Sequence, residues 1–198
     1  MSLKHSYTLI APFYDAVVAG PSRRLRAASL GRLPADGRAR VLVNGIGTGL
    51  DLPHLPPGPS YVATDLTAAM LARARRRNPG IAIRFVQADS LRLPFADAAF
   101  DHAVMHLILA VVSDPARCLA ETARVLKPAG SVLILDKFLR PGERAPLRRA
   151  LNLVSRHLAT RLDVVFEEVL ARVPELRLES DEPVLAGGWF RSIRLVKR

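Results

Sequence analysis

The chain has 198 residues, 49% of them hydrophobic, which is enough for one well-packed core and too few for two ordinary domains. Its formal net charge of +11 suits a partner that bears phosphates, either a nucleic acid or an anionic membrane surface. The single cysteine, Cys118, excludes an internal disulfide, and without a Cys/His cluster at ligand spacing we expect no zinc or other metal site.

Neither a signal sequence nor a membrane span is predicted. The N-terminal residues 1–15 lack the continuous apolar segment of a secretory signal, and no run of 18 uncharged apolar residues occurs. We therefore expect a cytoplasmic protein, with a peripheral contact to a membrane surface left open.

Strand-like and helix-like segments alternate from about residue 40 onward, a pattern typical of a parallel sheet covered by helices on both faces. The predicted strands are 40–44, 61–65, 81–86, 100–105 and 131–136. The predicted helices between them are 68–78, which stops before Pro79, and 114–126, which opens with Asp114 as N-cap. Residues 127–130, Lys-Pro-Ala-Gly, then turn the chain into the fifth strand. Beyond residue 140 the sequence becomes helical and basic to about Leu162, and two final strands are predicted around residues 187–188.

The stretch from Val41 to Gly49, VLVNGIGTG, reads as a strand running into a glycine-rich turn. Such a turn brings backbone N–H groups to the carboxyl edge of a sheet, where a cofactor can lie against the main chain. The glycine spacing is G-x-G-x-G, and Leu50 stands where a dinucleotide fingerprint requires a small residue, so NAD is disfavoured. An ordinary turn is the alternative interpretation.

Two aspartates follow the next strands. Asp65 ends the second strand 16 residues after Gly49, where its carboxylate can accept hydrogen bonds from the two hydroxyls of a ribose. Its alternative role is the N-cap of the helix that starts near Thr67. Asp89 follows the third strand and can face an adenine amino group, although the same pattern occurs in surface loops.

Between Tyr7 and Lys137 the chain resembles class I S-adenosylmethionine-dependent methyltransferases of the quinone-biosynthesis and phosphatidylethanolamine N-methyltransferase type. The resemblance rests on VLVNGIGTG (41–49), YVATDLTAAMLARAR (61–75), FVQADSLRLPFADAAFDHAV (85–104) and DPARCLAETARVLKPAGSVLILD (114–136). MHLILAVVSDP (105–115) and LDKF (135–138) are most similar to the bacterial phosphatidylethanolamine enzymes.

This resemblance implies an α/β fold with a Rossmann-like, mostly parallel sheet of about seven strands and helices on both faces. It implies a single methyltransferase domain over residues 1–198, with an N-terminal helical lid (1–38), a cofactor-binding core (39–137), and a helical insertion with the final strands (138–198). S-adenosylmethionine is the implied cofactor and S-adenosylhomocysteine the product. The implied cofactor-binding residues are Gly45, Gly47 and Gly49 at the methionine part, Asp65 at the ribose, Ala88 and Asp89 at the adenine, and Leu66, Ser90 and Tyr14, with Tyr7 and Tyr14 capping the site.

Val43 departs from the family pattern, which usually has an acid at this position that helps to hold the methionine end of the cofactor. Asn44 cannot simply replace that acid, because neighbouring strand residues point to opposite faces. A weaker site, a site arranged through backbone groups and a non-catalytic cofactor-binding module all remain open.

The sulfonium methyl is already electrophilic, so the main task of the protein is to hold an acceptor in line and to exclude water. An amine must be neutral when it attacks, whereas a phenol or a carbon acid needs a base more strongly. The resemblance places His106 beside the methyl group, and we predict it as the candidate catalytic base. Its alternative role is to line the pocket.

Residues 21–40 and residues 140–162 each carry six arginines and one acid. The second segment also has an apolar stripe formed by Leu147, Ala150, Leu151, Val154, Leu158 and Leu162. It is either an interfacial helix on anionic lipid or an ordinary amphipathic helix that packs on the domain. Nucleic acid is disfavoured because the basic segments lack interleaved aromatic residues.

These observations predict a methyltransferase for a small molecule or a lipid, with the amine of phosphatidylethanolamine-like lipids as the leading acceptor. The alternative acceptors are a quinone precursor and a natural product. The oligomeric state is left open.

Overall fold

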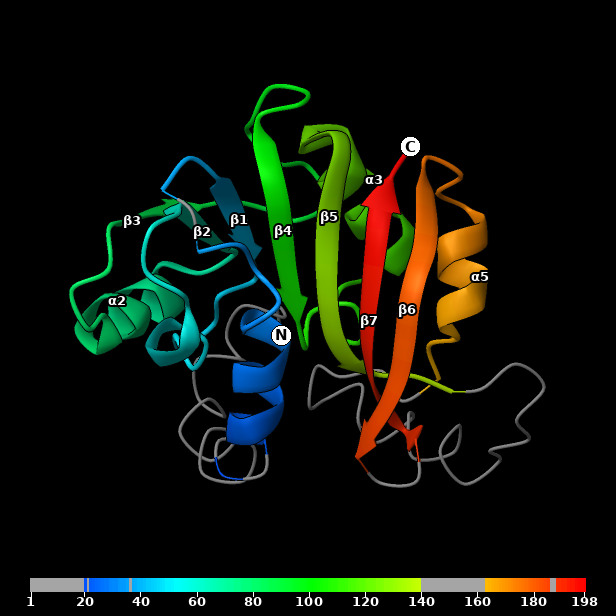
Figure 1. Cartoon of the computed structure of the whole chain (residues 1–198), viewed down its shortest axis with the longest axis horizontal. Coiled ribbons are helices and arrows are strands. Elements are labelled where there is room, and N and C mark those ends of the chain that lie inside the picture. Colours follow the sequence, from blue (N-terminus) through cyan, green and yellow to red (C-terminus); the bar gives the residue numbers. More distant parts are fainter. Residues whose placement is uncertain (1–19, 21, 36, 140–162, 186–187) are drawn as a thin grey trace.

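A seven-stranded sheet forms the centre of the computed structural model, which describes residues 20, 22–35, 37–139, 163–185 and 188–198 (Figure 1). The strands are β1 (Arg40–Asn44), β2 (Ser60–Asp65), β3 (Ile83–Gln87), β4 (Phe100–His106), β5 (Leu126–Lys137), β6 (Leu176–Leu185) and β7 (Phe190–Lys197). The labelled helices are α2 (Ala68–Arg77), α3 (Pro115–Val125) and α5 (Phe166–Ala171), with a short 3-10 helix η1 (Leu52–His54). Residues 22–30 are also helical.

The strand order is β3-β2-β1-β4-β5-β7-β6. Neighbours from β3 to β5 are parallel, whereas β7 runs antiparallel to both β5 and β6. The mostly parallel sheet of about seven strands and the two final strands are therefore confirmed. From β1 the next strands are added on one side of the sheet, as β2 and β3, and from β4 onward they are added on the other side. The carboxyl ends of β1 and β4 therefore flank a topological switch point, where open α/β sheets bind ligands.

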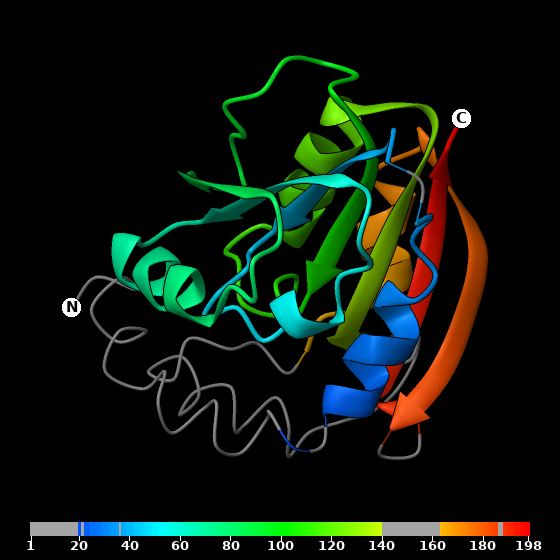
Figure 2. The same cartoon turned by 60° about the vertical axis from the view of Figure 1, so that its left-hand side comes forward.

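The two faces of the sheet carry separate apolar clusters, because successive strand residues point to opposite sides. On β1, Leu42 belongs to the cluster that includes residues of α3 and α5, whereas Val41 and Val43 belong to the other. That second cluster includes Leu30 from helix 22–30 and residues of η1 and α2. Figure 2 shows helix 22–30, in blue, and η1, in cyan, on the same side of the sheet.

The two predicted core helices form with the caps that their sequences require. Thr67 is the N-cap of α2, and its Oγ1 accepts the Met70 N–H at 3.3 Å. Asp114 is the N-cap of α3 and accepts the Arg117 N–H at 3.1 Å, as predicted. The cap at Asp114 is therefore confirmed, whereas the cap of α2 is Thr67 and not Asp65, the cap that the sequence offered.

The fifth strand was predicted to begin at residue 131, and this boundary is wrong, because β5 begins directly after α3, at Leu126. The first residues of β5 stay beside β4 through a register shift between Phe100 and His102, with Ala129 at a φ of 62°. A Cβ at Gly130 would lie 2.8 Å from the carbonyl oxygen of Asp101, so the glycine permits a close approach of the two strands.

Several predictions fall on the part of the chain that the structure does not describe. The basic helix predicted between residues 140 and 162, together with Tyr7 and Tyr14, lies outside the described residues. Among the helices that are described, none is long and apolar enough to cross a membrane.

Candidate cofactor site

The glycine-rich turn after β1 forms the centre of the candidate site. Gly45, Gly47 and Gly49 have φ values of 80°, 56° and 88°, a left-handed region that residues with a side chain adopt only at a cost. The N–H groups of Gly45 and Ile46 both donate to the carbonyl oxygen of Thr64, at 3.0 and 2.8 Å. These bonds fix the turn against the end of β2.

The three glycines have different surroundings. A Cβ at Gly49 would lie 2.9 Å from Cα of Ala74, and one at Gly45 would collide with the side chain of Ile108. A Cβ at Gly47 would meet no atom of the described residues within 4 Å. Gly45 and Gly49 are therefore required for packing, whereas Gly47 leaves an open cradle in which a cofactor can contact the main chain.

We expect Gly47→Ala and Gly49→Ala to separate cofactor binding from folding. The methyl at Gly47 enters the open cradle, so Gly47→Ala should weaken binding of S-adenosylhomocysteine at least about tenfold while costing about 1–2 kcal/mol of stability. Gly49→Ala should cost more stability, because its methyl must also displace the backbone of α2. Calorimetric titration and thermal unfolding of both variants test this. Wild-type affinity in Gly47→Ala would exclude a cofactor over this residue.

Asp65 stands at the end of β2, beside the turn. Its Oδ2 accepts the Gly47 N–H and its Oδ1 accepts the Thr67 N–H, both at 3.0 Å. Burial raises the pKa of Asp65 above its ordinary value, although these hydrogen bonds oppose the shift. The alternative N-cap role belongs instead to Thr67. The carboxylate is therefore held at the loop with lone pairs left for two vicinal hydroxyls, as the ribose prediction requires.

The residues predicted at the adenine lie at the ends of β2 and β3. Leu66 is 41% exposed, and the N–H of Ala88 donates to the carbonyl oxygen of Asp65 at 3.0 Å. Asp89 is exposed, and its Oδ1 accepts the Leu91 N–H at 2.9 Å. An exposed apolar side chain and an exposed carboxylate thus follow the ends of β2 and β3, beside Asp65, a combination that suits a purine with an amino group.

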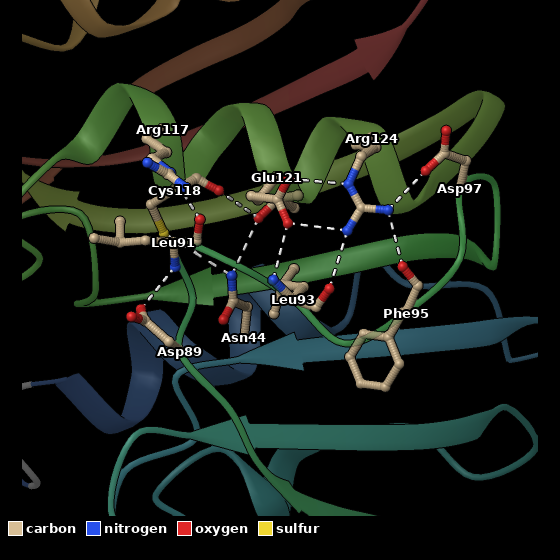
Figure 3. Close-up of polar contacts among 11 residues, drawn as sticks. Asn44, Asp89, Leu91, Leu93, Phe95, Asp97, Arg117, Cys118, Glu121 and Arg124 are labelled. Carbon is tan, nitrogen blue, oxygen red and sulfur yellow. Dashed lines mark hydrogen bonds and ion pairs between the residues drawn. The ribbon is translucent and has the colours of Figure 1, made fainter.

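Side chains of α3 hold the segment 89–97 that Asp89 begins (Figure 3). Arg117 Nε donates to the carbonyl oxygen of Leu91 at 2.9 Å, and Glu121 accepts the Leu93 N–H at 2.9 Å. Arg124 donates to the carbonyl oxygens of Leu93 and Phe95 at 3.0 and 2.8 Å. This loop is therefore fixed before any ligand binds, which lowers the cost of ordering it.

Ser90, also predicted as a cofactor contact, points its hydroxyl into the protein. Its Oγ donates to Asn44 Oδ1 at 2.6 Å, and Thr64 Oγ1 donates to the same oxygen at 3.1 Å. Asn44 Nδ2 in turn donates to Thr122 Oγ1 at 3.1 Å on α3. Asn44 is fully buried, and this network joins the ends of β1 and β2 and the segment after β3 to α3. Because the Ser90 hydroxyl is used in the network, it is the backbone of Ser90 that a cofactor could contact.

On the opposite face, Val43 is 1% exposed and packs in the apolar cluster with Val104. His106 lies two residues beyond Val104 on β4 and belongs to a group of four buried polar residues. We call this group the Asp51 cluster: Arg26, Ser29, Asp51 and His106. His106 Nδ1 lies 2.8 Å from Asp51 Oδ1, and its Nε2 lies 3.0 Å from Ser29 Oγ. Arg26 Nη1 donates to the same Asp51 oxygen at 2.7 Å.

The Asp51 carboxylate stays charged in this cluster. Burial alone would raise the pKa of Asp51, but the charges and hydrogen bonds of His106 and Arg26 outweigh burial and hold the pKa well below its ordinary value. The predicted base, His106, is buried with a hydrogen bond at each ring nitrogen. The sequence did not indicate this cluster, because its bonds join residues 25, 55 and 77 positions apart.

Comparisons with known proteins identify the family of this chain. The family described as "Methyltransferase domain" matches residues 42–134. The chain is 33% identical over 190 residues to a phosphatidylethanolamine N-methyltransferase of Cereibacter sphaeroides, covering 93% of this chain and 91% of the relative. It is 36% identical over 137 residues to a demethylmenaquinone methyltransferase of Renibacterium salmoninarum, covering 67% and 56%. The solved structure of an S-adenosylmethionine-dependent methyltransferase from Mesorhizobium loti has a TM-score of 0.67 at 21% identity, covering 86% of this chain and 96% of that one.

Proposed function

This chain belongs to the S-adenosylmethionine-dependent methyltransferases, and we propose that the methyl acceptor is the amine of a phosphatidylethanolamine-like lipid. The observation that carries the proposal is the extent of the match: 91% of the phosphatidylethanolamine enzyme is covered, against 50–78% of the demethylmenaquinone enzymes that match. A similarity over 93% of this chain extends beyond the cofactor core, into segments where acceptors bind in this fold.

The residues described above divide the work of the reaction. When bound, the cofactor supplies an electrophilic methyl group. The carboxylate of Asp65 would hold the ribose, and the turn at Gly47 would contact the methionine part. The carboxyl ends of β1 and β4 define the edge at which an acceptor must approach. Catalysis then rests mainly on holding the acceptor in line and on excluding water.

The surroundings of His106 favour an amine over a carbon acceptor. A neutral amine attacks with its own lone pair after losing a proton to solvent, whereas a quinol or carbon acceptor needs a base at the site. His106 is buried and its Nε2 contacts Ser29 Oγ, so this histidine could remove a proton from an acceptor only after that contact is replaced. Methylation of a quinone precursor, favoured by the 36% identity to the demethylmenaquinone enzyme, is the second candidate.

A transfer assay with methyl-labelled S-adenosylmethionine tests the acceptor. We expect label to enter vesicles of phosphatidylethanolamine and phosphatidylglycerol, and not vesicles in which phosphatidylcholine, which has no free amine, replaces the phosphatidylethanolamine. Label in a demethylated menaquinone analogue alone would establish the second candidate. A protein that binds the cofactor and labels neither acceptor would refute both.

The proposed contact with anionic lipid involves the basic segment 140–162 and enters the same assay. Arg148→Glu with Arg149→Glu is expected to reduce transfer most on anionic vesicles, because each arginine near such a surface contributes about 1 kcal/mol. Arg75→Glu with Arg76→Glu, the same change of charge on α2, is the matched control. Equal losses in the two variants would show a general effect of net charge.

A further inference from the structure

We propose that Arg26 and Asp51 together bind the amino-acid end of S-adenosylmethionine, and so fill the role that the family's usual acid has at the position of Val43. The inference concerns the cofactor alone and holds for any acceptor. It rests on the position of the Asp51 cluster, on its charges and on hydrogen-bonding groups of the cluster that have no partner in the described part of the chain.

The cluster lies where a longer acidic side chain at position 43 would point. Val43 pairs in register with Val104 on β4, and both side chains belong to the apolar cluster under helix 22–30. Because strand residues two apart share a face, His106 lies on that same face, one step nearer the carboxyl edge. Its bond to Asp51 therefore places a carboxylate at this face of the edge, close to the glycine turn.

The charges in the cluster match an amino-acid zwitterion. Asp51 and Arg26 are 2% and 6% exposed, and burying an ion pair is costly unless its remaining lone pairs and protons find partners. Both polar contacts of Asp51 fall on Oδ1, and within the described residues Oδ2 accepts no hydrogen bond. Arg26 uses Nε on Ser22 and Nη1 on Asp51, which leaves Nη2 without a bond in the same set. Asp51 Oδ2 is therefore suited to accept from the ammonium group of the cofactor, and Arg26 Nη2 is suited to donate to its carboxylate.

The main competing explanation is purely structural, with the pair only tying helix 22–30 to the loop before η1. Two ligands distinguish the explanations: S-adenosylhomocysteine, which carries the amino-acid end, and 5′-methylthioadenosine, which lacks it. If the pair binds this end, Asp51→Asn should weaken the binding of S-adenosylhomocysteine at least about tenfold and change the affinity for methylthioadenosine less than about twofold. A structural role predicts equal losses for both ligands or none for either, and either result would overturn the proposal.

Arg26→Gln should show the same selective loss as Asp51→Asn. Asp101→Asn is the matched control, because Asp101 pairs with Lys127 near the start of β4, at the opposite edge of the sheet. We expect this control to bind both ligands as the wild type does. Calorimetry supplies the affinities and thermal unfolding verifies that each variant is folded. Since no acceptor is present, a failure here leaves the proposed acceptor untouched.

Val43→Glu keeps the proposal testable if Asp51→Asn does not fold. With Asp51 already in the role, a new carboxylate at position 43 should not tighten S-adenosylhomocysteine. Clearly tighter binding would show that the role is vacant and would overturn the proposal. In the double variant Val43→Glu with Asp51→Asn, the restored acid should recover part of the affinity lost in Asp51→Asn alone.

Discussion

Asp65→Asn is expected to weaken S-adenosylhomocysteine by about 30- to 1000-fold, the largest effect on binding that we predict. The carboxylate accepts the Gly47 and Thr67 N–H groups and would accept two ribose hydroxyls. The amide turns one acceptor into a donor facing these groups, and hydrogen bonds to a charged partner are worth about 1.5–3 kcal/mol each. Because methylthioadenosine also carries the ribose, Asp65→Asn should weaken its binding as well, whereas Asp51→Asn should leave that binding nearly unchanged. Unchanged affinity for both ligands would refute the ribose assignment.

The same site predicts how binding depends on pH. Burial raises the pKa of Asp65, so on acidification it gains a proton at a higher pH than an exposed aspartate does. The protonated acid is a weaker acceptor for the hydroxyls, so affinity should fall as the pH drops through this raised pKa and should level off above it. In Asp65→Asn this dependence should be lost. Calorimetric titrations of both proteins from about pH 7 downward provide the comparison.

Asn44→Leu is expected to lower the free energy of unfolding by about 2–4 kcal/mol, the largest effect on stability that we predict. Leucine nearly preserves the volume, but it leaves the hydroxyls of Thr64 and Ser90 without their common acceptor between the sheet and α3. Denaturant unfolding with an unchanged m-value would measure the loss.

The control for Asn44→Leu is Asn78→Ala. Asn78 follows α2 and is less buried, and within the described residues its side chain bonds the backbone of Ile81 alone. It should therefore lose only about 1 kcal/mol. Equal losses in the two variants would show that the hydrogen bonds around Asn44 contribute no more to stability than those of Asn78 do.

Local signals in the sequence predicted the fold and the glycine turn of the candidate site. Apolar segments of strand length, the cap at Asp114 and the glycine turn are each readable within a few residues, and each is confirmed. The early start of β5 could not be read in this way, because it depends on a close approach of Gly130 to β4 that only the assembled sheet creates. The short helix α5 was missed for a related reason: its six residues are set by packing of Phe166 and Val169 rather than by a long periodic pattern.

The proposed methionine half of the site depends on contacts between distant residues. The sequence shows that Val43 lacks an acid, but the one replacement side chain that it suggested was the neighbouring Asn44, which the structure places in a network on the opposite face. Asp51 follows the last glycine of the turn by two residues, and that closeness was the available signal. Its partners Arg26 and His106 come from a helix and a strand far along the chain. Only the fold brings these three charges and dipoles together.

Calorimetric titration of the wild-type chain with S-adenosylhomocysteine tests the central claim most directly. The geometry at Gly47, Asp65 and Asp51 predicts one site per chain with a dissociation constant of about 100 µM or tighter. Methylthioadenosine should compete for the same site with lower affinity, because it lacks the amino-acid end. The absence of binding at millimolar ligand would contradict the account, because neither the cofactor site nor any reaction built on it would then exist.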